Sequence, residues 1–215
     1  SLGEYSALVA AGALEHEEAA RLVAERGEAM QAAAEAAPGT MAAVLGLEPE
    51  LVAAACKDVD GVWVANDNAP GQVVVAGTAA GIEAASARAK DLGAKRVLPL
   101  PVGGAFHSPL MGGAQERLEQ ALAGAAFGAA TTPVVANVDA APHLDGFPAL
   151  LGAQLAAPVR WRESLLTMRS LGAGIFMELG PGAELSGMVK RTVDGAERVT
   201  VNTPDDLEAA RARLA

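Results

Sequence analysis

Cysteine, aromatic residues and long apolar runs are all scarce in this sequence. The one cysteine, Cys56, cannot form an internal disulfide, and its apolar neighbours predict a small core residue. No stretch approaches the roughly 20 apolar residues that a membrane helix needs, and no charged and then apolar leader precedes Ser1. We therefore expect a protein of the reducing cytoplasm that does not enter a membrane.

Basic residues are also in the minority. The chain has 16 Lys and Arg against 26 Asp and Glu, a formal charge of −10, so no broad basic face is expected and neither nucleic acid nor an anionic membrane is a predicted partner. Hydrophobic residues make up 51% of the 215 positions, which is enough for a substantial core. The length suits one domain, or one domain that carries a smaller insert.

Hydrophobic periodicity predicts alternating helices and strands. We expect helices at 1–11, 17–36, 49–56, 80–92, 109–123, 147–155 and 161–170, after Gly182 and from Asp205, and strands at 41–45, 62–65, 73–76, 96–100, 134–137, 175–179 and 199–201.

The middle of the chain has its own order of elements, βαββαβ, which is typical of a ferredoxin-like unit with an antiparallel sheet. The predicted fold class is therefore α/β, in which a parallel sheet wrapped by helices is interrupted by this smaller unit. We expect residues 1–38 and 103–215 to form the large subdomain and residues 39–102 to form the ferredoxin-like subdomain. A cleft should lie between the two.

Ser1 and His107 are the first candidates for chemistry. Ser1 stands at the start of the first expected helix, where backbone N–H groups and the helix dipole would stabilise an oxyanion. Ser is also a common N-cap, so capping alone accounts for it in isolation. His107 lies among apolar neighbours in a loop before a helix that starts with Pro, whereas His16 and His143 lie in polar surroundings. A structural role remains the alternative for a lone His107.

Arg26 is unusual because it falls on the apolar stripe of its helix, between Leu22 and Met30. A buried guanidinium requires an anion. Two partners fit equally well at this point: an Asp or Glu of the chain itself, or a substrate carboxylate held by two parallel hydrogen bonds.

The motifs of the chain resemble, in order, those of the malonyl-CoA:acyl carrier protein transacylases. The matching segments are Ser1-Leu-Gly-Glu-Tyr-Ser-Ala-Leu8, Arg26-Gly with Met30, Asn66-Asp-Asn68-Ala-Pro-Gly-Gln72-Val-Val, Gly104-Ala-Phe-His107-Ser, Gln154-Leu with Pro158-Val-Arg-Trp161, and Glu178-Leu-Gly-Pro-Gly182. Because these six matches extend over the whole chain, the resemblance is specific.

The resemblance implies a large subdomain with a hydrolase-like core and a ping-pong transfer through a malonyl-serine ester. Ser1 would be the nucleophile and His107 its general base, and the position of Gln154 would orient the histidine through a carbonyl, where hydrolase triads use a carboxylate.

The resemblance also implies the substrate contacts. Arg26 would hold the free carboxylate of the malonyl group, and the backbone N–H of Leu2 would be one donor to the oxyanion. Met30 and Asn68 would line the pocket, and Phe106 would fill the space that a methyl branch of the substrate needs.

The partners implied are malonyl-CoA and an acyl carrier protein of fatty-acid or polyketide synthesis, which brings the phosphopantetheine thiol itself. No cofactor and no metal is expected, and we expect a monomer. Because such carriers are strongly acidic, the basic pair Lys190 and Arg191 is the predicted contact for the carrier protein, with Lys95 and Arg96 as a second pair to test.

The sequence departs from the family at its start. The family has a strand, a Gly-Gln-Gly loop with a second oxyanion donor, several helices and a Gly-His pair before the nucleophile, so we expect the large subdomain to be incomplete at its N-terminus. Three alternatives stay open: an N-terminal-nucleophile hydrolase, an esterase of the α/β-hydrolase type, and a fragment that only binds a carrier protein.

Overall fold

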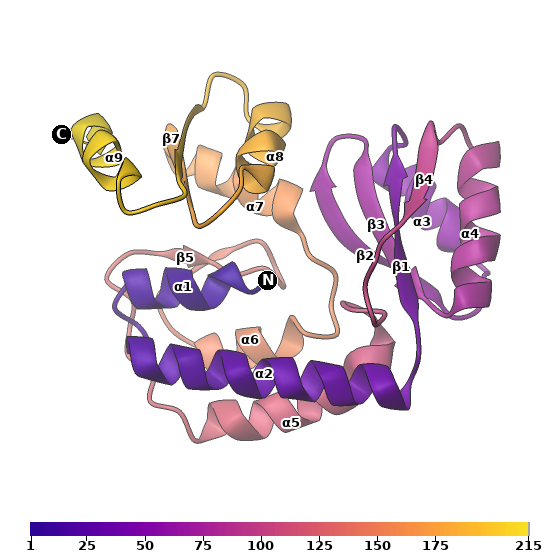
Figure 1. Cartoon of the computed structure of the whole chain (residues 1–215), viewed down its shortest axis with the longest axis horizontal. Helices are drawn as coiled ribbons and strands as arrows, with labels where there is room; N and C mark the ends of the chain where they lie inside the picture. The colour runs from indigo at the N-terminus through magenta and orange to yellow at the C-terminus, as the bar shows by residue number, and fades with distance from the viewer. Residues whose placement is uncertain (215) are drawn as a thin grey trace.

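The computed structural model of the protein describes residues 1–214 and has two subdomains side by side (Figure 1). Ala215, the last residue of the predicted large subdomain, lies outside the described residues. The predicted α/β class is confirmed by alternating helices and strands, which include both an antiparallel and a parallel sheet. No helix among the described residues is both long and apolar enough to cross a membrane.

The smaller subdomain has the predicted order of elements, βαββαβ. Its elements are β1 Thr40–Leu45, α3 Pro49–Cys56, β2 Val62–Ala69, β3 Gln72–Gly77, α4 Ala79–Asp91 and β4 Arg96–Pro99. The strands form one antiparallel sheet in the order β2-β3-β1-β4. Figure 1 shows α3 and α4 on the side of this sheet that faces away from the rest of the molecule.

Strand β3 is buried on both faces because successive side chains of a strand point in opposite directions. Val73 and Val75 pack into the core with α3 and α4, whereas Val74 and Ala76 pack into a second cluster on the opposite face. That second cluster includes Ala105, two residues before His107. The sheet therefore supports, from behind, the loop that carries His107.

The larger subdomain contains the remaining elements. They are α1 Gly3–Ala10, α2 His16–Ala36, η1 Pro109–Met111, α5 Gly112–Ala123, β5 Val134–Val135, β6 Pro142–His143, α6 Phe147–Ala153, α7 Trp161–Ser170, β7 Ile175–Leu179, α8 Glu184–Thr192, β8 Glu197–Val201 and α9 Asp206–Leu214. Its main core lies among α1, α2, α5 and α6, with Leu8, Leu22, Leu118 and Leu151 fully buried. In Figure 1 the N-terminal end of α1 points toward the smaller subdomain.

One of the three strands predicted in the larger subdomain is shorter than expected, and a short strand that was not predicted, β6, is present. β7 and β8 form a parallel pair, but the strand expected at 134–137 is reduced to β5, which pairs antiparallel with β6. The reason lies at Asn137, whose backbone N–H donates to the side chain of Glu4 and whose side chain binds the backbone near Pro158. Side-chain hydrogen bonds therefore replace a strand ladder at this point.

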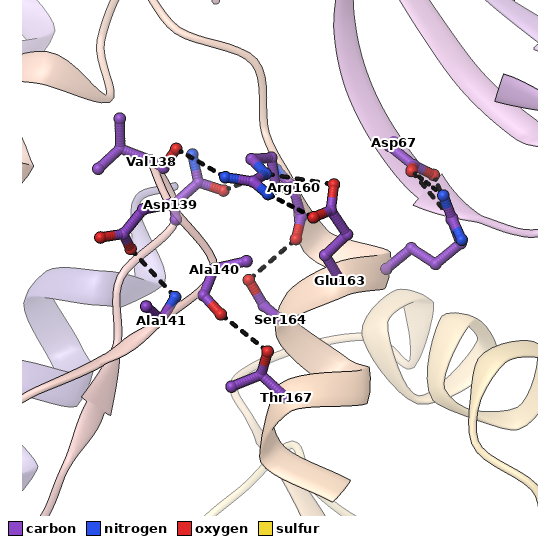
Figure 2. Close-up of polar contacts among 11 residues, drawn as sticks. Asp67, Val138, Asp139, Ala140, Ala141, Arg160, Glu163, Ser164 and Thr167 are labelled. Carbon is purple, nitrogen blue, oxygen red and sulfur yellow. Dashed lines mark hydrogen bonds and ion pairs between the residues drawn. The ribbon is translucent and has the colours of Figure 1, made fainter. Parts of the chain in front are cut away.

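The segment from Val159 to Arg162 of the larger subdomain packs against β2 of the smaller one. Val159 accepts a hydrogen bond from the N–H of Asp67 at 2.8 Å and donates to the carbonyl of Ala65 at 2.7 Å, so it pairs with β2 like a short extra strand. Three residues on, Arg162 forms an ion pair with the Asp67 carboxylate at 2.7 Å. Figure 2 shows the Asp67 carboxylate of β2 directed toward its partner on α7. The segment that leads into α7 is thereby fixed to the edge of the smaller subdomain.

A close approach of the backbone requires glycine where α2 passes into β1. A Cβ atom on Gly39 would lie 2.6 Å from the Cβ of Ala105 and 2.8 Å from the carbonyl oxygen of Gly77. We predict that Gly39→Ala lowers the free energy of unfolding by about 1–3 kcal/mol, because neither backbone can move away without disturbing the sheet. The midpoint of thermal unfolding measures this effect.

The matched control is Gly27→Ala, on the exposed side of α2, where an added Cβ meets nothing within 4 Å. It should stabilise the protein by about 0.5–1 kcal/mol because alanine favours a helix interior. Equal unfolding midpoints for the two variants would contradict the packing argument.

Candidate active site

Ser1 and His107 meet at the N-terminal end of α1. The Ser1 Oγ lies 3.0 Å from the His107 Nε2. His107 has a φ of 57°, in the left-handed region that few side chains adopt, and this conformation aims the ring back toward α1. Ser108 fixes the turn, because its hydroxyl donates to the Ala105 carbonyl at 2.6 Å and accepts from the N–H of Leu110 at 3.3 Å.

The second ring nitrogen of His107 faces two backbone carbonyls. Its Nδ1 lies 3.2 Å from the Gln154 oxygen and 3.1 Å from the Ala157 oxygen. A carbonyl oxygen can only accept, so Nδ1 must carry the hydrogen and Nε2 is left free to accept from the Ser1 hydroxyl. The tautomer is therefore the one that a general base requires, and backbone carbonyls take the place that a carboxylate has in hydrolase triads.

Burial keeps this imidazole uncharged. His107 is 7% exposed, and burial, which is the largest cause, lowers its pKa to about 4. The ring is consequently neutral at physiological pH and ready to take a proton from Ser1.

Arg26 lies on the buried face of α2 and reaches the same serine. Its Nη2 donates to the Ser1 Oγ at 2.9 Å, while its Nε is buried without a hydrogen-bond partner. Within residues 1–214 the guanidinium forms no ion pair with an Asp or Glu. The sequence left two partners open, and the first, a carboxylate of the chain itself, is not found among these residues. The guanidinium therefore keeps N–H donors next to Ser1 that a bound anion would accept from.

The other predicted substrate contacts come from the start of α1, from α2, from β2 and from the loop before η1. Leu2 is the N-cap residue of α1, so its N–H is at the helix end where backbone donors have no partner within the helix. Met30 lies one turn beyond Arg26 and packs on the main core, and Phe106 packs on the cores of both subdomains. Asn68 belongs to β2. In the part of the chain that the structure describes, no hydrogen bond joins Met30 or Asn68 to Ser1, Arg26 or His107.

The predicted contacts for a carrier protein lie on a separate element. Lys190 and Arg191 are exposed in the last turn of α8, and the Arg191 guanidinium donates to the side chain of Gln72 in the smaller subdomain.

Among the described residues, no three His, Cys, Asp or Glu side chains gather in a way that would hold a metal ion.

Ala157, Glu4 and Asn137 contribute to the site and were not predicted from the sequence. Ala157 supplies the second carbonyl to His107. Glu4 is 8% exposed and accepts from the Gln154 Nε2 at 3.1 Å and from the N–H of Asn137 at 3.0 Å. Burial raises the pKa of Glu4, against the effect of the Asn137 N–H.

A sequence signal for Glu4 did exist. Glu4, Leu8 and Ala11 are spaced at four and three residues, so the carboxylate falls on the buried stripe of α1. The same criterion, a charge on an apolar stripe, identified Arg26. The Ala157 carbonyl has no such signal, because backbone groups are common to all residues.

A model of the acyl transferase domain family matches residues 1–204, nearly the whole chain. The chain therefore belongs to the acyl transferase domain family.

Individual relatives narrow the family further. The chain is 44% identical to the malonyl CoA-acyl carrier protein transacylase of Bacillus subtilis, with 98% of this chain and 68% of the relative aligned. It is 43% identical to the protein of the same name from Escherichia coli K12, with 98% and 70% aligned. This chain is thus a member of the malonyl CoA-acyl carrier protein transacylase group.

Solved structures agree with this placement. An acyl carrier protein S-malonyltransferase from Vibrio cholerae superposes with a TM-score of 0.92 at 42% identity, covering 97% of this chain and 70% of that one. A malonyl-transacylase in complex with its type II PKS acyl-carrier protein superposes with a TM-score of 0.93 at 40% identity, covering 98% and 70%. The predicted resemblance is confirmed.

The protonation of His107 can be measured through the reactivity of Ser1. We predict that the rate of labelling of Ser1 by a serine-reactive organophosphonate stays level through neutral pH and falls only as the pH approaches about 4, where the base becomes protonated. Rapid quenching followed by intact-protein mass spectrometry gives the rate. His107→Ala, the control, should lose about 10²-fold or more at neutral pH. A midpoint near the ordinary histidine value of about 6.5 would mean that the ring is solvated.

Proposed function

We propose that this protein transfers the malonyl group of malonyl-CoA to the phosphopantetheine thiol of an acyl carrier protein, for fatty-acid or polyketide synthesis. Membership of the malonyl CoA-acyl carrier protein transacylases supports the reaction. The observation that carries the substrate is Arg26, a buried cation for which residues 1–214 supply no acidic partner and whose Nη2 lies 2.9 Å from the Ser1 Oγ. The guanidinium matches the free carboxylate that distinguishes malonyl from simple acyl groups.

The first half of the reaction loads the serine. The Ser1 Oγ attacks the thioester carbonyl carbon of malonyl-CoA while the His107 Nε2 takes the hydroxyl proton. The tetrahedral oxyanion would be stabilised by backbone N–H groups at the start of α1, with Leu2 as one donor. The C–S bond then breaks, the coenzyme A thiolate takes the proton from His107, and malonyl remains on Ser1 as an ester.

The second half transfers the group to the carrier. His107 accepts the proton of the phosphopantetheine thiol, and the sulfur attacks the ester carbonyl. When the C–O bond breaks, the Ser1 oxygen takes the proton back, so both serine and histidine return to their starting states. The Gln154 and Ala157 carbonyls hold the Nδ1 hydrogen throughout, and their partial negative charge stabilises the imidazolium in each half.

The remaining pocket residues would set which acyl group fits. Phe106 lies between the cores of the two subdomains and would occupy the space of a methyl branch on the malonyl carbon, with Met30 and Asn68 as further walls. The reaction requires proton transfer and electrostatic stabilisation alone, so we propose that the protein uses no cofactor of its own. All the proposed catalytic groups come from one chain, which is consistent with a monomer.

Nothing in the comparisons supports an esterase, an N-terminal-nucleophile hydrolase or a protein that only binds a carrier. The ferredoxin-like sheet is foreign to an esterase of the α/β-hydrolase type. The histidine next to Ser1 argues against an N-terminal-nucleophile hydrolase, in which the α-amino group is the base.

Arg26→Lys tests the proposed substrate. We predict that this change slows malonyl loading of Ser1 by about 10²-fold, because lysine lacks the planar fork that binds a carboxylate. Acetyl-CoA, which has no free carboxylate, should load the variant and the wild type at similar rates. Intact-protein mass spectrometry after brief exposure to each thioester gives both rates.

Ser1→Ala is the control in this experiment and should gain no acyl group from either thioester. Near-normal malonyl loading of Arg26→Lys would remove the guanidinium from the proposal. A wild-type protein that gains no malonyl group would contradict the proposed reaction itself.

The carrier protein would dock where the two subdomains meet at α8. Arg191 donates a hydrogen bond to the side chain of Gln72 in β3. Leu45 of β1 pairs with Gln72 on one side and with Arg96 of β4 on the other. The two basic pairs predicted from the sequence, Lys190–Arg191 and Lys95–Arg96, therefore lie near the same end of the sheet. Neighbouring strands are about 5 Å apart, so this region is small enough for one acidic helix to contact both pairs.

Reversing the charge of both Lys190 and Arg191 to Glu tests this surface. We predict that the double variant transfers malonyl to an acidic carrier protein about tenfold more slowly at low salt, yet is loaded from malonyl-CoA at the wild-type rate. Gln72→Ala is the matched control, because it removes the Arg191 contact across the subdomains without changing any charge. Equal slowing in both variants would mean that the contact between the subdomains, rather than the charge, matters.

A further inference from the structure

Glu4 lies three residues after the nucleophile, in the first turn of α1, and among the described residues its hydrogen bonds go to neither Ser1 nor His107. Its Oε2 accepts two hydrogen bonds, one from the Gln154 side-chain amide at 3.1 Å and one from the Asn137 backbone N–H at 3.0 Å. These donors come from two segments that are far from α1 in the sequence. The carboxylate therefore links the helix of the nucleophile to the parts of the chain that surround His107.

Gln154 connects this carboxylate to the histidine. Its side chain is 1% exposed and donates to Glu4, while its backbone oxygen accepts from the His107 Nδ1. Because one residue makes both contacts, the hydrogen bond to Glu4 anchors the residue whose backbone carbonyl binds His107.

Asn137 holds the other end of the same segment. Its Nδ2 donates to the Pro158 carbonyl at 3.3 Å and its Oδ1 accepts from the Arg160 N–H at 3.1 Å. The Ala157 carbonyl, which binds His107, is adjacent to Pro158. Figure 2 shows how the segment continues, with Arg160 directed toward Val138 and Glu163.

We propose that Glu4 is a positioning residue for the acyl transfer: through Gln154 and Asn137 it fixes the two carbonyls that orient His107 toward the nucleophile on its own helix. Glu4 touches neither substrate nor reacting atoms, so its effect passes through the histidine. The distance between base and nucleophile is thereby set by one buried side chain that belongs to the nucleophile's helix.

Only an acceptor suits this place. An ionised carboxylate has no donor, and one oxygen has two lone pairs for two N–H groups. The carbonyl of a glutamine at position 4 has the same two lone pairs, whereas a leucine would leave both donors without a partner in the interior. Glu4→Gln and Glu4→Leu therefore separate the hydrogen-bonding role from the bulk of the side chain.

The test compares Glu4→Leu, Glu4→Gln, Gln154→Met and the double variant Glu4→Leu/Gln154→Met. Single-turnover loading of Ser1 over a range of malonyl-CoA concentrations gives a maximal rate constant and an apparent affinity. We expect Glu4→Leu and Gln154→Met each to lower the maximal rate constant by about 10- to 100-fold with the affinity unchanged, because a small misplacement of the base slows the chemical step. The double variant should lose no more than the poorer single variant, and Glu4→Gln should stay within about threefold of wild type.

Leu8→Ala is the matched control for stability. Leu8 lies one turn along the same buried stripe and has no polar link to the site, so this change should lower the unfolding midpoint without changing the rate constant. An unchanged rate in Glu4→Leu, an equal loss in Leu8→Ala, or additive losses in the double variant would each overturn the proposal. If Glu4→Leu does not fold, wild-type rates in Gln154→Met would overturn it equally.

This inference rests on the proposed function, but a second assay separates the two. Labelling of Ser1 by an organophosphonate depends on the same base and involves no malonyl group. One outcome is that Glu4→Leu and Gln154→Met are labelled more slowly than the wild type, while malonyl-CoA does not load the wild type. This outcome would support the positioning role and contradict the proposed substrate. Unchanged labelling with normal malonyl loading would do the reverse.

Discussion

The arrangement of the site depends on a buried histidine whose Nδ1 faces two backbone carbonyls. Those hydrogen bonds fix the tautomer of His107, and the tautomer gives Nε2 the lone pair that Ser1 needs. A backbone carbonyl cannot turn independently of its chain, unlike a carboxylate on a side chain. The protein must therefore hold a whole segment, residues 154–160, where a triad needs one Asp, and the buried polar contacts around Glu4 and Asn137 meet this requirement.

The elements and the fold class were largely predictable from the sequence. The ferredoxin-like order follows from short apolar strands separated by Ala-rich helices, and the unusual place of Arg26 follows from the 3.6-residue period of α2. Both patterns depend on local spacing, which a sequence displays directly. The strand expected at 134–137 failed for a non-local reason, since Asn137 bonds to residues far away in the sequence.

The site itself was only partly predictable. Ser1, His107 and Gln154 entered through family motifs, because local patterns alone favoured a capping serine and a structural histidine. Glu4 had a visible signal, a charge on an apolar stripe, but the identity of its partners required the three-dimensional arrangement. The Ala157 carbonyl and the pairing of Val159 with β2 involve only the backbone, so the residue types at these positions do not indicate either contact.

The pairing of Val159 with β2 has a consequence for engineering. Because this segment lies against the edge of the smaller subdomain two residues after the Ala157 carbonyl, the two subdomains are not interchangeable modules. A chimera that exchanged only residues 39–102 with a relative would place a foreign strand edge, and a foreign partner for Arg162, against the support of His107. Residues 157–162 have to travel with the inserted subdomain if the hybrid enzyme is to keep its base in place.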